Sequence, residues 1–259
     1  MVTPSGSENG GISVQLEGQD LQQFAHGSSS AKPMTVSFYA KSGVSTAGGG
    51  NSGHVYSIQV RKYDASSNRK YVVRPFTVTD SWQRFSFTFI GDTATAIRDT
   101  SDVGIQIIWQ LACGPDDLVS ETGTWTSSTK FQGVSGQNNF MDNTSNEFFL
   151  TGVQFEMGSQ ATDFEHRSFN EELTLCHRYY QSGYFRIRLN GRSSETISEF
   201  THYFKTTMRA NPTVTTANVY GTLDSVTFAN MNFGGCYLDF SNDTSLNFAA
   251  TVNLSLIHI

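Results

Sequence analysis

The chain has 259 residues, 37% of them hydrophobic and 15% charged, and a formal net charge of −6. Such a length can bury the core of one large β-domain or of two modest ones. The acidic balance offers no basic face for phosphates, which argues against nucleic acid as a partner. No apolar run approaches the roughly 20 residues that cross a bilayer, so we expect no membrane insertion.

The cysteines and histidines give no sign of a metal site. Cys113, Cys176 and Cys236 are far apart and form no CxxC pair, and the histidines show no HxH or HExxH spacing. The opening residues, MVTPSGSENGG, have neither the basic nor the apolar region of a signal peptide. We therefore expect no metal and no other cofactor, and a protein that assembles with free thiols in a cytoplasm.

Alternation of apolar and polar residues predicts strands in the first part of the chain. The clearest segments are TVSFYAK, SWQRFSFTFIGD, VGIQIIWQL and EFFLTGVQFE. Turn-rich stretches separate them, such as SGVSTAGGGNSG, DASSNRK and SGQNNFMDNTSN. Short strands without helical segments between them favour an all-β antiparallel sandwich over residues 1–166.

Several side chains of this sandwich are candidates for binding a ligand. Trp109 and Phe87 alternate in phase with apolar neighbours, so we assign both to the core. Trp125 lies in the polar stretch ETGTWTSSTK, where it either serves a surface role or folds back over the edge of the sandwich. The predicted ligand-binding residues are Trp125, two tyrosines on or near outward-facing positions, and two glutamines on the solvent face of their strand: Tyr39, Tyr56, Gln106 and Gln110.

The spacing becomes helical after residue 166. Ser168 and Glu171 form a capping box, and Phe169, Leu173, Cys176 and Tyr180 recur at helical intervals. We expect a linking helix within residues 167–183. Its apolar stripe, Leu173, Cys176 and Tyr180, packs either against other copies of the chain or on the sandwich of its own chain.

The charges around this helix are predicted to fix a joint between two structural pieces. Arg167 and Arg178 are expected to pair with carboxylates such as Glu165, Glu171 and Glu172. Cys176 is expected to be a buried thiol and not a nucleophile, because the adjacent His177 points about 100° away on a helix.

An alternative for the acidic residues is catalysis. Glu156 and Glu165 would be the carboxylate pair of a glycoside hydrolase, which must lie roughly 5–10 Å apart in a cleft. Acidic residues that flank a turn are more often solvated, so we expect no enzyme.

The last part of the chain returns to short alternating strands. Residues 184–253 contain six candidates: YFRIRL, EFTHYFK, TVTTANVY, SVTFAN, GCYLDF and NFAATVNL. A β-module of this size is small for an independent core, which favours homo-oligomerisation. The final residues 254–259, LSLIHI, match the translation of an adapter used in transposase-based library preparation, so we expect an artefact in an environmental sequence. The alternative is a genuine final strand, because Leu254, Leu256 and His258 alternate with Ser255, Ile257 and Ile259.

The central segment FFLTGVQFEMGSQATDFEHRSFNEELTLCHRYYQ is similar to the segment that joins a jelly roll to a C-terminal β-module in tailed-phage tail-fibre and virion proteins. Upstream, VQLEGQDLQQF, AKPMTVSFYAKS, DSWQRFSFTFIGDT and GIQIIWQL resemble the jelly-roll strands of that family, and downstream MRANPTVT resembles one of its strand openings. The family has more chain before VQLEG, so its first strand is expected to lie outside this sequence.

This resemblance implies a carbohydrate-binding-module-like jelly roll on a multimeric virion appendage. It suggests a homotrimeric tail-fibre subunit, assembled in the host cytoplasm, whose partners are other virion proteins and a glycan of the host surface. It supplies no catalytic residues. Two alternatives stay open: a structural spacer or decoration protein of the virion, and a glycan depolymerase.

Overall fold

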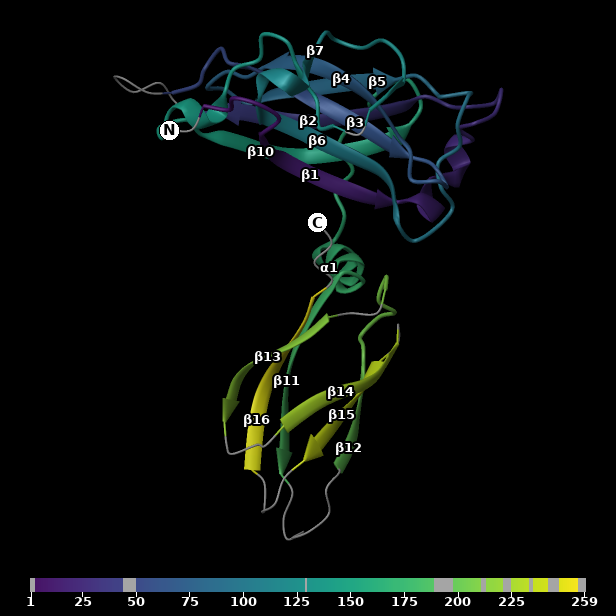
Figure 1. The fold of residues 1–259 in the computed structure, drawn as a ribbon, viewed down its shortest axis with the longest axis vertical. Coiled ribbons are helices and arrows are strands. Elements are labelled where there is room, and N and C mark those ends of the chain that lie inside the picture. The colour runs from purple at the N-terminus through teal and green to yellow at the C-terminus, as the bar shows by residue number, and fades with distance from the viewer. Residues whose placement is uncertain are drawn as a thin grey trace. The chain divides into compact units, whose positions relative to one another are not determined.

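A computed structural model describes residues 3–43, 50–128, 130–188, 198–210, 213–220, 225–232, 235–241 and 247–255. The chain divides into two compact units, Met1–Glu165 and His166–Ile259, within one residue of the boundary expected from the sequence. Figure 1 shows both units. Within the described ranges, no helix is long and apolar enough to cross a membrane.

The first unit is built mainly from two antiparallel sheets (Figure 1). The five-stranded sheet has the order β1 (Asn9–Glu17), β6 (Val103–Cys113), β3 (Val55–Tyr63), β4 (Arg69–Thr77) and β8 (Thr126–Ser127). The three-stranded sheet has the order β10 (Phe148–Met157), β2 (Met34–Ser42) and β5 (Gln83–Phe89). Shorter elements complete it: the parallel pair β7 (Leu118–Val119) and β9 (Gly133–Val134), and the 3₁₀ turns η1 (Gly18–Phe24), η2 (Pro115–Asp117) and η3 (Phe140–Asp142).

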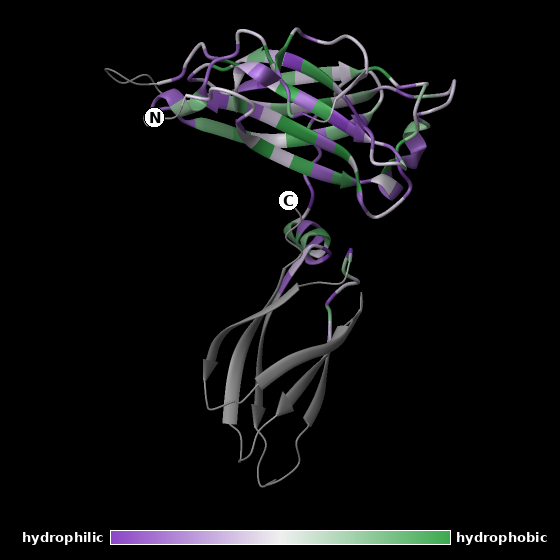
Figure 2. Ribbon diagram, viewed as in Figure 1, coloured by the Kyte–Doolittle hydropathy of each residue, from purple (hydrophilic) through white to green (hydrophobic). Residues whose placement is uncertain are grey.

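The core lies between these two sheets, as the alternating pattern predicts. Figure 2 shows hydrophobic and hydrophilic residues alternating along the strands of the first unit. Phe38 of β2 meets Trp109 of β6 with ring centroids 5.4 Å apart. Trp109 is buried and Phe87 is half-buried against the same core, so both assignments to the core are confirmed. The predicted all-β antiparallel sandwich is likewise confirmed.

The outer face of the five-stranded sheet is covered, which the sequence did not indicate. After β6 the chain folds back over this face: the Gln137 side chain accepts a hydrogen bond from Ser57 and donates one to the backbone of Gln110. The Arg61 guanidinium lies 4.1 Å from the ring centroid of Phe131 and donates to the carbonyl of Lys130. The covering segments, residues 115–119 and 130–138, thus remove the central strands from solvent.

The burial of this outer face overturns two predictions of ligand-binding residues, and the core overturns a third. Gln106 and Gln110 do point away from the core, but they are buried and not on a solvent face. Tyr56 is buried inside the sandwich, because it shares its phase along β3 with Ile58 and Val60.

The second unit begins with α1 (Phe169–His177) and continues as two three-stranded antiparallel sheets. One sheet has the order β11 (Tyr180–Arg188), β16 (Asn247–Ser255) and β13 (Thr213–Tyr220). The other has the order β12 (Ser198–Tyr203), β15 (Gly235–Ser241) and β14 (Ser225–Asn232). The six strands coincide with the six predicted segments, while residues 256–259 of the expected adapter sequence lie outside the described residues.

The helix starts as predicted but ends earlier. Ser168 and Glu171 form the capping box, with the Glu171 N–H donating to Ser168 Oγ at 3.3 Å and the Ser168 N–H donating to Glu171 Oε2 at 2.9 Å. The last helical residue is His177. Tyr180 is therefore the first residue of β11 and not part of a helical stripe, because the sheet ladder with β16 replaces the helical hydrogen bonds there.

We predict that Gly104→Ala destabilises the first unit by about 2 kcal/mol or more. A Cβ atom at this position of β6 would lie 2.4 Å from the Cα atom of Gly18 and 2.8 Å from Cγ2 of Ile97. Gly123→Ala is the matched control, since its Cβ would meet nothing within 4 Å. Urea unfolding of both variants checks this prediction, and equal midpoints would contradict it.

Candidate functional site

The outer face of the three-stranded sheet is the candidate site. Because Val36, Phe38 and Ala40 of β2 face the core, the intervening side chains of this strand point outward. Two of these, Thr35 and Ser37, are nevertheless buried. Something other than the opposite sheet must therefore cover one half of this outer face.

The cover is the connector that follows β10, residues 158–165. Thr35 Oγ1 donates to the carbonyl of Gly158 at 2.8 Å, and Thr88 Oγ1 donates to the carbonyl of Ser159 at 3.0 Å. Gln154 bridges the connector twice, donating to Thr162 Oγ1 at 3.0 Å and accepting from the backbone N–H of Glu165 at 2.8 Å. These bonds fasten the connector across one half of the face.

Glu156 takes part in the same fastening. Its carboxylate accepts hydrogen bonds from the backbone N–H of Thr162, at 3.1 Å, and from the Thr162 hydroxyl. Burial alone would raise the pKa of Glu156, but the hydrogen bonds from Thr162 and Gln154 and the charge of Arg84 lower it below its ordinary value. Glu156 is thus an ionised acceptor that positions the connector.

The other half of the face is open and aromatic. Trp82 is 48% exposed, Phe149 is 40% exposed and Tyr39 is 36% exposed. The rings of Trp82 and Phe149 lie 6.5 Å apart at an interplanar angle of 66°, so they form a corner. We call Tyr39, Trp82 and Phe149, with Lys41 between the last two, the open aromatic patch.

Only Tyr39 of this patch was among the residues predicted from the sequence. Phe149 is opposite Lys41 in the ladder between β10 and β2, and Tyr39 is opposite Arg84 in the ladder between β2 and β5. The available signal was the phase of Phe149, which alternates with the inward-facing Phe148 and Leu150. Trp82 directly precedes β5, and its phase, two residues before Arg84 and alternating with the inward-facing Phe85 and Phe87, gave the same signal.

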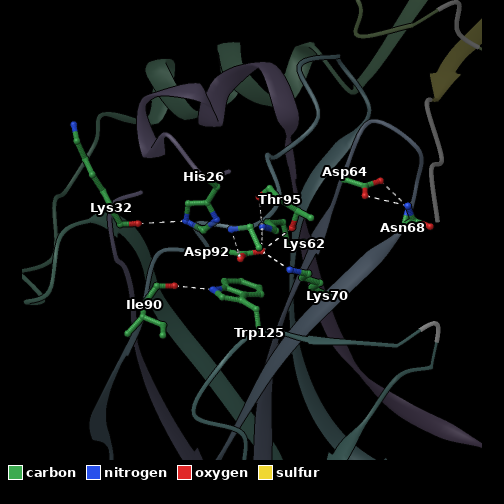
Figure 3. Close-up of polar contacts among 11 residues, drawn as sticks. His26, Lys32, Lys62, Asp64, Asn68, Lys70, Ile90, Asp92, Thr95 and Trp125 are labelled. Atoms are coloured by element: carbon green, nitrogen blue, oxygen red, sulfur yellow. Dashed lines mark hydrogen bonds and ion pairs between the residues drawn. The ribbon is translucent and has the colours of Figure 1, made fainter. Parts of the chain in front are cut away.

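Trp125 lies elsewhere and folds back onto the sandwich. Its indole N–H donates to the carbonyl of Ile90 at 2.7 Å, and its ring meets that of His26 edge-on at 5.8 Å, as Figure 3 shows. The ring also packs against the main core. The second of the two alternatives for Trp125 is therefore the observed one, since the partly buried ring folds back over the sandwich.

Beside Trp125 lies a buried ionic cluster centred on Asp92 (Figure 3). The Asp92 carboxylate accepts hydrogen bonds from Lys62 Nζ at 2.5 Å, Lys70 Nζ at 3.0 Å and Thr95 Oγ1 at 2.6 Å. Burial alone would raise the pKa of Asp92, but these donors hold it well below its ordinary value. Because its oxygens are fully engaged, Asp92 anchors the loop after β5 to β3 and β4.

His26 completes this end of the sandwich as a neutral imidazole. Its Nε2 lies 3.3 Å from the carbonyl of Lys32 and must donate to it, which leaves Nδ1 without a proton. Nδ1 is buried and has no hydrogen-bond partner. Burial, followed by the charge of Lys62, lowers the pKa of His26 from 6.5 to about 4.

The predicted joint residues are arranged on and beside α1. Arg167 Nη1 pairs with Glu172 Oε1 at 3.3 Å, as expected. Leu173 is exposed, and Cys176 is an exposed free thiol, so the expectation of a buried Cys176 was wrong within this chain. A helical stripe identifies apolar residues but does not say what covers them. The pairing of Arg178 with a carboxylate stays a prediction.

The remaining titratable residues add no further centre. Within the ranges that the structure describes, no three His, Cys, Asp or Glu side chains gather to hold a metal ion. Comparisons with family models, with curated proteins and with solved structures found no match to this chain.

We predict that the first unit loses stability as the pH falls from 6.5 towards 4, in part because of His26. Since the folded-state pKa of about 4 is below the ordinary 6.5, the unfolded chain binds this proton first. The contribution of His26 to the free energy of unfolding is complete above pH 6.5. Below that pH it decreases by at most about 1.4 kcal/mol per pH unit.

Urea unfolding at pH 7, 5.5 and 4.5 checks this, with His26→Phe as the comparison. The phenyl ring keeps the aromatic contacts but cannot bind a proton, so its stability should depend less on pH across this window. Equal pH dependence of wild type and variant would contradict the assignment. The effect of Asp92 is distinguished by its pH range, since the contribution of Asp92 to stability is lost only as the pH falls below about 4.

Proposed function

We propose that this chain is a non-catalytic subunit of a tailed-phage tail fibre or another virion appendage, and that its first unit presents a site for a glycan of the host surface. The resemblance of residues 148–181 to the joining segment of such proteins supports the first part. The arrangement of two β-units on either side of that segment is also what the resemblance implies.

The open aromatic patch is the observation that carries the glycan-binding part. Aromatic rings offer flat apolar faces on which the C–H faces of a sugar can stack, with hydroxyl groups left to hydrogen-bond at the edges. The patch stands on paired strands, so its geometry is set before a ligand binds. Exposed aromatic side chains gathered on one sheet face are typical of an interaction surface.

The two alternatives have less support from the structure. A spacer or decoration protein has no need for exposed rings on an ordered sheet. A depolymerase needs two carboxylates across a cleft, whereas Glu156 is engaged by Thr162 in fastening the connector.

We further propose that the subunit is a homotrimer held partly by α1. Phe169, Leu173 and Leu175 of this helix are exposed, as is Tyr180 at the start of β11. A helix of nine residues is too short to be stable without packing, so these side chains require a partner surface. Free thiols at Cys113 and Cys176 are compatible with assembly in the host cytoplasm.

We predict that the wild-type protein binds glycans or host cells, and that Trp82→Ala or Phe149→Ala weakens binding about ten-fold or more. The loss follows from removing a stacking surface. Glycan-array and cell-adsorption measurements on the folded variants check it. Trp125→Ala, corrected for its lower stability, should leave the affinity unchanged because Trp125 lies outside the patch.

Tyr203→Ala is the matched control, since it removes an exposed aromatic ring from the second unit. Binding lost equally in all variants would point to a non-specific effect and contradict the patch. Wild-type protein that binds no glycan and no cell would favour the spacer. Hydrolysis of a polysaccharide by folded protein would favour the depolymerase.

For assembly, we predict a trimer in light scattering at micromolar concentration, and dissociation by Leu173→Glu. The introduced charge would be buried in the interface without a partner. Asn170→Glu places the same charge on the same helix and should leave the trimer intact. A monomeric wild type would overturn the proposal and favour packing of the stripe within its own chain.

A further inference from the structure

We propose that the glycan recognised by the open aromatic patch is acidic, and that the ammonium group of Lys41 binds its carboxylate, phosphate or sulfate. This inference rests on the proposed function, because it assigns a chemical class to the ligand of that patch. It follows from the position of Lys41 between the rings of Trp82 and Phe149, and from the contacts of Arg84, the other cation on the same face.

Lys41 is held in place by the sheet. It belongs to β2, the central strand of its sheet, and stands opposite Phe149 of β10. Its Nζ atom lies 4.9 Å from the ring centroid of Phe149 and 5.4 Å from that of Trp82. The ammonium group is therefore seated in the corner formed by the two rings, and little side-chain freedom is left to lose on binding.

The ring contacts leave the three N–H donors of the ammonium group without a hydrogen-bond acceptor among the described residues. A cation–π contact is an attraction to the ring face and does not consume an N–H donor, of which an ammonium has three. None of the ion pairs among the described residues involves Lys41. The carboxylate of Glu147, the residue before β10, lies near Gly43, and no ion pair between it and Lys41 is found among the described residues.

Arg84, the other cation on this face, is bonded to the connector. Its guanidinium lies 6.0 Å from the ring centroid of Tyr39, and it donates to Ser37 Oγ at 3.4 Å and to the carbonyl of Thr162. These bonds hold the connector. Lys41, by contrast, is in none of the ion pairs among the described residues and stands between two exposed rings of the patch, so we assign the acidic group to it.

An anionic sugar can interact with both the exposed rings and the ammonium group. Its apolar face would pack on the exposed part of the Trp82 ring, while its acidic group accepts hydrogen bonds from Lys41 Nζ. The rings exclude water from one side of the ammonium group, which strengthens its attraction to an anion relative to bulk water. A neutral sugar would gain the stacking but not this charge pairing.

The test uses the full-length protein and two pairs of probes that differ in charge through esterification of the acid group: sialyllactose with its methyl ester, and oligogalacturonate with its methyl ester. Affinities are measured for wild type, Lys41→Met and the control Lys32→Met, which removes an exposed lysine away from the patch. We expect tighter binding of the acidic member, weakened by higher salt and reduced about ten-fold by Lys41→Met but not by Lys32→Met.

Equal affinity for the acidic and neutral members, or unchanged acidic binding by Lys41→Met, would overturn this inference. If Trp82→Ala still abolished binding in that case, the glycan-binding function would stand and only the charge assignment would fail. Wild-type protein that bound neither member of either pair would overturn the inference together with the proposed function.

Discussion

The burial of Phe38 between the two sheets is the constraint on which the first unit depends. Its ring meets Phe76 and Trp109 of the five-stranded sheet, each at 5.4 Å, and Phe85 of its own sheet at 5.3 Å. Because side chains alternate along a strand, the same register that buries Phe38 turns Tyr39 and Lys41 outward. The core and the open aromatic patch are therefore two consequences of one register.

Segments outside the two main ladders decide which parts of the outer faces remain accessible. Residues 115–119 and 130–138 cover the five-stranded sheet, and residues 158–165 cover half of the three-stranded sheet through bonds to Thr35, Thr88 and Gln154. In both places, polar strand residues are buried against backbone groups of the cover. The open aromatic patch is the portion of the second face that the connector leaves uncovered.

The tryptophans show how a similar side chain acquires different roles. Trp125 satisfies its indole N–H at the carbonyl of Ile90 and shields the Asp92 cluster, so its contribution is to stability. Trp82 stands at the start of an edge strand, with nearly half of its surface exposed. The distinction matters for function, because only the second arrangement leaves a ring face on which a sugar can stack.

The sequence by itself determined the features that depend on neighbours along the chain. Alternation identified β2, β5, β6 and β10 of the first unit and the six strands of the second. The spacing of Ser168 and Glu171 located the start of α1, and the phase of Trp109 and Phe87 assigned them to the core. It could not place Gln106 and Gln110, because alternation separates two faces of a strand without saying what covers them. Tyr56 was misplaced although its phase with Ile58 pointed inward.

The tertiary structure alone decided the composition of the candidate site. Trp82, Lys41 and Phe149 come from three segments that are far apart in sequence, and only the pairing of β2 with both β5 and β10 brings them together. The same holds for Asp92 and Lys62, which meet where the loop after β5 closes over the end of β3. Such contacts are set by the register between strands, and this register is fixed by the packing of the whole core rather than by any local stretch of sequence.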